Sequence, residues 1–150
     1  MARRFQFQLE TMLRVRQLRE REAKRKVAAK RAEIALVDRL NTQTAEEISR
    51  QQEALLAGQR EGRLDPLMLQ RGRAWIGHLR RTVGQRHVQR AELLARWQEL
   101  QAAWHAARTQ ARIIEKLRER RWEEYVHDRE RKEQAAADEL AQQLHRHEAI

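Results

Sequence analysis

The chain has 150 residues, of which 36% are charged and 5% aromatic, and alanine is the most frequent of the 41% counted as hydrophobic. Alanine adds little apolar area, so the composition argues against a compact globular core. The absence of cysteine excludes disulfides and thiolate metal sites, and no apolar run approaches the roughly 18 residues of a membrane span. We therefore expect a cytosolic protein without direct membrane insertion.

Positive charge is concentrated at the N-terminal end. Residues 1–31 contain eleven Arg and Lys against three Glu, which accounts for +8 of the net charge of +10. A basic end attracts nucleic acid, anionic lipid or an acidic protein surface in the same sequence-independent way. The charge alone does not choose among these partners.

The first helix is expected at about residues 8–57. Ahead of it, Phe5 and Phe7 alternate with polar residues at a period of two, as a strand would. From Leu9 onward the apolar spacing alternates between three and four. A seven-residue repeat of this kind is typical of one face of a supercoiled helix. The repeat comprises Leu13, Glu20, Val27, Ile34, Asn41, Ile48 and Leu55.

A turn is predicted at residues 58–65, where Gly58 and Gly62 flank a polar stretch and Asp65 with Pro66 is typical of a helix start. The second helix is expected at about residues 66–147. Its apolar stripe contains Ile76, Leu79, Val83, Leu93, Trp97, Leu100, Trp104, Ala107, Ala111 and Ile114. A short connection favours antiparallel pairing. The predicted fold is all-α: an antiparallel two-helix coiled-coil hairpin, with helix two longer, forming a single domain over residues 1–150.

The register of the hairpin predicts an overhang. If Ala57 faces Pro66, the numbers of paired residues add to about 123, and helix two has no partner from about residue 118. Residues 118–133 contain six acidic and six basic side chains, and such dense opposite charge supports a solvated helix. Trp122, Tyr125 and Val126 stand out in this polar segment.

Catalytic and cofactor motifs are missing from the sequence. The glycines around residue 60 are not followed by the lysine of a nucleotide-binding loop. The histidines are scattered, and a two-helix rod offers no pocket that would perturb a carboxylate pair. We predict no enzyme activity and no catalytic, cofactor-binding or metal site. A basic coiled coil that binds nucleic acid through RVRQLREREAKRKVAAKR is an alternative, although glutamates interrupt the run.

The stretch FQFQLETMLRVRQLREREA resembles the N-terminal signature FxFxLExxLxxR of the FliJ family of flagellar type III export proteins. The resemblance implies a non-enzymatic stalk, similar to the gamma subunit of rotary ATP synthases. It also implies that the chain ends bind a hexameric export ATPase, and that other regions contact the cytoplasmic domain of an export gate membrane protein and export chaperones. Such a protein would lie in the cytoplasm, peripherally associated with the inner membrane. The equivalent stalk of a virulence-type injectisome is a close alternative.

Two sets of contact residues follow from the resemblance and the hairpin together. The hypothesised ATPase-binding set is Phe5, Phe7, Leu9, Arg14, Arg16, Trp122, Tyr125 and Val126. Trp75 and Leu79, an aromatic and a leucine four residues apart after the glycine-containing turn, are assigned to the gate or chaperones. The two phenylalanines either staple the chain ends together or are offered to a partner.

Overall fold

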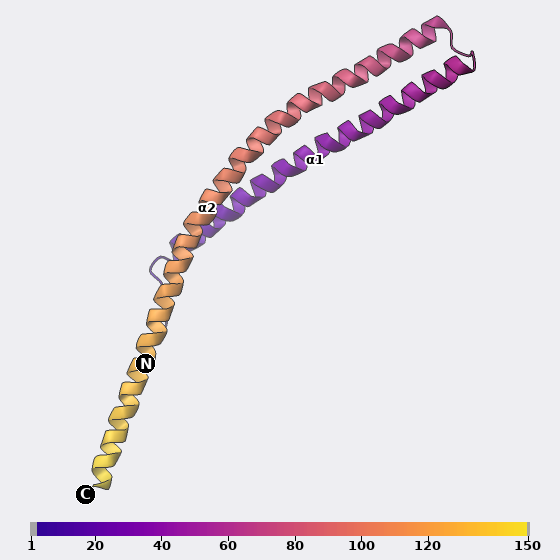
Figure 1. Ribbon diagram of the computed structural model, residues 1–150. Coiled ribbons are helices and arrows are strands. Elements are labelled where there is room, and N and C mark those ends of the chain that lie inside the picture. Colours follow the sequence, from indigo (N-terminus) through magenta and orange to yellow (C-terminus); the bar gives the residue numbers. More distant parts are fainter. Residues whose placement is uncertain (1–2, 150) are drawn as a thin grey trace. The chain divides into compact units, whose positions relative to one another are not determined.

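The computed structural model describes residues 3–149 and contains two helices, α1 (Glu10–Arg60, 51 residues) and α2 (Pro66–Glu148, 83 residues) (Figure 1). Residues 61–65 join them. The described residues contain no strand. These elements confirm an all-α hairpin whose second helix is the longer. The described residues also contain no helix that is both long and apolar enough to cross a bilayer.

The turn begins three residues later than expected, because Gly62 rather than Gly58 terminates α1. Gly62 has φ of 68°, in the left-handed region that glycine adopts without a steric penalty. The Arg63 N–H donates to the Gly58 carbonyl at 3.0 Å, and the Gly62 N–H donates to the Gln59 carbonyl at 3.3 Å. This pair of bonds is the Schellman arrangement, which satisfies carbonyls at the end of a helix.

The beginning of α2 follows the sequence expectation. Asp65 Oδ1 accepts a hydrogen bond from the Met68 N–H at 2.8 Å, and Pro66 occupies the first helical position. The side chain thus satisfies one of the amides that lack an intrahelical partner, while the proline needs none.

The later end of α1 shifts the register of the hairpin. The residue numbers of the ion pair Arg90–Asp38 add to 128, as do those of Arg118–Glu10, where the sequence argument expected about 123. Each α2 residue therefore faces an α1 residue about five positions further along than expected. The part of α2 that lacks a partner also starts later: all side chains from residue 129 to residue 149 are exposed, whereas the overhang was expected from about 118.

Contacts along the two helices divide the chain into two units. One comprises Glu22–Trp104, around the turn, and its buried side chains are Val27, Ile34, Val37, Ile76 and Leu79. The other joins the first 21 residues to the chain from His105 onward, and its buried side chains are Leu13, Ala111 and Ile114. Seven of the eight are named in the predicted apolar stripes, and the eighth, Val37, follows Ile34 at the spacing of three that the same stripe uses.

Asn41 interrupts the core of the unit around the turn. Its side-chain amide nitrogen and oxygen are both buried and have no hydrogen-bond partner among residues 3–149. Arg86 bonds instead to the neighbouring Leu40 carbonyl at 3.2 Å and to Thr44 Oγ1 at 2.7 Å. A buried amide without a partner costs about 1–3 kcal/mol. Polar residues at such positions are known to specify helix register at a cost in stability.

Candidate functional site

The segment ahead of α1 packs as an extended chain on α2, within the unit that joins the two chain ends. Phe5, Phe7 and Leu9 are half-buried, while Gln6 and Gln8 between them are exposed. Alternate side chains of an extended chain point to opposite sides, so the period of two reflects packing against a helix without any strand partner in the described chain. The Glu10 N–H then donates to the Phe7 carbonyl at 3.1 Å and starts the helix.

Three aromatic rings meet where this segment crosses α2, and we call Phe5, Trp122 and Tyr125 the aromatic cluster. Phe5 lies edge-on to Trp122, with ring centroids 5.2 Å apart and an interplanar angle of 77°. Its centroid is 5.6 Å from that of Tyr125, and Trp122 stacks on Tyr125 at 5.7 Å. Aromatic pairs of this geometry stabilise by about 0.5–1.5 kcal/mol beyond their buried area. The cluster therefore joins the N-terminal segment to α2 ahead of its exposed C-terminal part.

Polar contacts reinforce this junction on both sides of the cluster. The Tyr125 hydroxyl donates to the Arg3 carbonyl at 2.5 Å. Arg118 forms an ion pair with Glu10 at 2.9 Å, and its guanidinium also lies 5.7 Å from the Phe5 centroid. The ion pair is partly exposed, so its contribution is of the order of 0.2–1 kcal/mol. Positioning, rather than stability, is its main effect.

The next turns of α1 are held to α2 by two amide contacts. Arg16 donates to Gln110 Oε1, and the Gln17 amide donates to Glu115 Oε1 at 3.2 Å. Arg14 is exposed and forms no ion pair with a described residue. Of the two arginines in the hypothesised ATPase-binding set, Arg14 is therefore the one whose charge is not already engaged in holding the helices together.

An open groove of about 820 Å³ runs beside the extended segment. Four residues of the predicted ATPase-binding set line this groove: Phe5, Phe7, Leu9 and Tyr125. Charged side chains of α2 form its rim. Val126, the residue after Tyr125, is half-buried, and Trp122 is 47% exposed. Phe5 thus packs the N-terminal segment against α2, while Trp122 still offers an aromatic surface to solvent.

The sequence did not single out Arg118 and Glu10, which bracket Phe5 in the structure. Their opposite charge is visible in the sequence, but only the register tells which charges meet. The expected register placed residue 118 opposite residue 5, whereas the observed ion pair joins Arg118 to Glu10.

Tyr125→Phe is expected to loosen the extended segment without unfolding either helix. The substitution keeps the ring in the aromatic cluster but removes the hydrogen bond to the Arg3 carbonyl, which is worth about 0.5–1.5 kcal/mol. Amide exchange at residues 3–9 should accelerate by up to about tenfold, while helical circular dichroism stays constant. Unchanged exchange in this segment would show that the aromatic contacts alone hold it.

The second predicted contact pair, beside the turn, does not form one surface. Trp75 is 46% exposed and stacks on His78, with ring centroids 5.4 Å apart. Leu79 is only 9% exposed and belongs to the core of this unit. A spacing of four places two residues on the same side of a helix, but the boundary of the buried stripe passes between these two.

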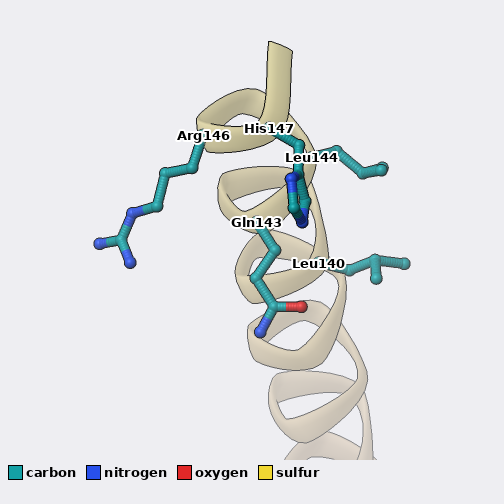
Figure 2. Close-up of a pocket in the computed structure, with 5 residues that line it drawn as sticks. All are labelled: Leu140, Gln143, Leu144, Arg146 and His147. Carbon is teal, nitrogen blue, oxygen red and sulfur yellow. The ribbon is translucent and has the colours of Figure 1, made fainter. Parts of the chain in front are cut away.

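The exposed end of α2 carries an apolar pair without a described partner. Leu140 and Leu144 are 58% and 59% exposed. Figure 2 shows them pointing to one side of the helix, with Arg146 directed to the other side and Gln143 lying across the front of the helix. No group of three potential metal ligands occurs in the described residues, including those around His147.

Comparison with known protein families matches residues 5–149 to the family described as Flagellar FliJ protein. The match begins at Phe5 of the aromatic cluster and extends over both helices. No curated protein and no solved structure matches the chain.

Proposed function

The chain belongs to the family of flagellar FliJ proteins, components of the flagellar export apparatus, and from that premise we propose that it is a stalk that binds the hexameric export ATPase through its joined chain ends. The stalk has no catalytic role of its own. It links the ATPase ring to the export gate and to export chaperones. The flagellar family favours this system over the injectisome alternative, and its partners would hold it at the cytoplasmic face of the inner membrane.

The aromatic cluster is the observation that carries this proposal. It brings the start of the chain and the last third of α2 together, and it leaves Trp122 47% exposed beside the extended segment. Exposed aromatic side chains are frequent anchors of protein interfaces. Each helix is about 10–12 Å across with its side chains, and this pair of helices is the part that would enter the central opening of the ring.

The basic residues of the first turns of α1 supply the second part of the contact. Arg14 is exposed, next to the buried Leu13, and has no acidic partner among residues 3–149. A positive surface of this kind accelerates association with an acidic lining and makes binding sensitive to salt. We therefore place Arg14 among the residues that face the ATPase, and we give Arg16 a supporting role through Gln110.

Arg14→Glu is expected to weaken binding of the cognate hexameric ATPase by about tenfold at low salt, because it replaces attraction to an acidic lining with repulsion. Titration by biolayer interferometry at several salt concentrations measures the effect, which should shrink as salt rises. Arg39→Glu is the control, since Arg39 is also exposed and changes the net charge equally but lies in the other unit. Equal weakening by both variants would show that binding depends on the net charge of the protein and not on the position of Arg14.

At the turn we propose that Trp75 contacts the cytoplasmic domain of the export gate or an export chaperone, with Leu79 supporting it from the core. Trp75→Ala should reduce capture of these partners about tenfold or more, since an exposed tryptophan anchor can contribute above 1.4 kcal/mol. Binding of the ATPase should remain unchanged. The single substitution is the sharper test, because Leu79→Ala would also open the core. If Trp75→Ala weakened binding of the ATPase as much as capture of the gate or chaperones, the hypothesis of separate binding surfaces would be ruled out.

A further inference from the structure

A groove of about 540 Å³ lies between α1 and α2 close to the turn, entirely within the unit formed by Glu22–Trp104. Its apolar lining includes Leu55 from α1 and Leu69 and Ile76 from α2. Leu55 approaches α2 closely, since a Cβ atom on Gly72 would lie only 2.6 Å from its Cδ2 atom. Leu56, the next residue, is 53% exposed at the edge of the groove.

On both polar walls of this groove, the lining residues are spaced seven positions apart. Gln52 and Gln59 line it from α1, and Arg73 and Arg80 line it from α2. Each pair is seven residues apart, which corresponds to two helical turns and about 10.5 Å along the axis. The groove thus presents an apolar strip, and one side of this strip carries two arginines that are two helical turns apart.

The two arginines of this groove are not neutralised by the described residues. Neither Arg73 nor Arg80 forms an ion pair within residues 3–149, and the opposite wall contributes neutral glutamines. The acidic groups of the turn are already engaged, since Glu61 pairs with Arg63 at 2.8 Å and Asp65 caps α2. Carboxylates that meet these guanidinium groups would have to come from another molecule.

We propose that this groove binds an amphipathic helix of a partner protein that carries two carboxylates seven residues apart. Its apolar face would lie on Leu55, Leu69 and Ile76, and its carboxylates would pair with Arg73 and Arg80. Helices commonly bind in apolar grooves through side chains at helical spacing, and a guanidinium can hold a carboxylate through two parallel hydrogen bonds. The charge and spacing of the groove together select this occupant.

The groove is distinct from the surface assigned to Trp75. That residue follows Arg73 by two positions, which places it about 200° further around the helix. Trp75 does not line the groove. The hairpin end near the turn therefore has two separate binding faces, and binding to the groove does not depend on the contact with the ATPase.

The experiment uses the full-length protein and a fluorescent, helix-stabilised peptide. The peptide has leucines at spacings of three and four, and glutamates at positions i and i+7 beside this stripe. Fluorescence anisotropy should show saturable binding to the wild-type protein. The Arg73→Glu/Arg80→Glu variant should bind at least tenfold more weakly, and exchange of both peptide glutamates for lysine should partly restore its binding. The exposed position of Leu56 also makes Leu56→Glu a test of the apolar edge, with a comparable loss expected.

The control variant Arg71→Glu/Arg81→Glu changes the net charge equally, but neither residue lines the groove. It should bind the peptide as the wild type does. Equal binding by the two double variants, or no saturable binding to the wild type, would overturn the proposal. Sedimentation tests the remaining occupant: a concentration-dependent dimer that Leu56→Glu abolishes would assign the groove to a second copy of the chain and would also overturn it.

Discussion

A variant that lacks residues 2–9 is expected to lose stimulation of the cognate hexameric ATPase while its helical circular dichroism stays at the wild-type level. The deletion removes Phe5 and the extended segment, but α1 begins only at Glu10. The aromatic cluster would lose the ring that joins the chain ends, and the proposed contact surface would be dismantled. A steady-state phosphate-release assay with increasing amounts of the variant measures this stimulation. It should be at least tenfold lower than with the wild-type protein.

The matched control for this deletion is Gln6→Ala with Gln8→Ala. Both glutamines are exposed in the same extended segment, between the half-buried apolar residues. Full stimulation by this variant and none by the deletion would place the effect on the apolar side chains. Undiminished stimulation by the deletion variant would contradict the proposed role of the N-terminal end.

Ile114→Ala is expected to cause the largest loss of stability. Ile114 is 8% exposed and is one of three buried side chains among the described residues of its unit, with Leu13 and Ala111. Truncation of a buried isoleucine to alanine costs about 2–5 kcal/mol. With so few buried neighbours, the pairing of α1 with α2 in this unit should open before the turn region unfolds. The midpoint of its thermal transition should fall by about 5–15 °C, as followed by the fluorescence of Trp122.

Ile113→Ala provides a control one residue away. Ile113 is 63% exposed, and substitutions at such positions usually change stability by no more than about 0.5 kcal/mol. The two variants have the same composition and differ only in which side of α2 loses a side chain. Similar melting curves for both would contradict the assignment of the core.

The apolar stripes could be predicted because the seven-residue repeat follows directly from helix geometry. Leu13, Val27 and Ile34 lie on that repeat and are buried. Asn41, at the next position of the same repeat, also turns its side-chain amide inward. Periodicity therefore fixed which face is covered, even where the residue is polar.

The register could not be derived in the same way, because it depends on which glycine ends α1. Gly58 and Gly62 are both suitable in the sequence, and only the backbone shows that Gly62 adopts the positive φ. A shift of a few residues at the turn then moves every pairing along the hairpin. The ion pair between Arg118 and Glu10 was missed for this reason.

The sequence indicated which aromatic residues lie near one another at the open end of the hairpin, but not how their rings pack. Phe5, Trp122 and Tyr125 were selected as unusual aromatics, and the structure places them in contact. The alternation of Phe5 and Phe7 suggested a strand, because a period of two reports an extended backbone but not what it packs against. Similarly, the spacing of Trp75 and Leu79 predicted that both lie on the same side of α2, but it did not predict that Leu79 is buried while Trp75 is exposed.

Site-specific photocrosslinking tests the central claim most directly. A benzoylphenylalanine in place of Trp122 should crosslink to the cognate hexameric ATPase in a reconstituted complex, and the crosslink should disappear with the variant lacking residues 2–9. The same group in place of Val88, which is 63% exposed in the other unit, should give no such crosslink. Crosslinking to the ATPase from position 88 but not from position 122 would contradict the assignment of the chain ends to the ATPase.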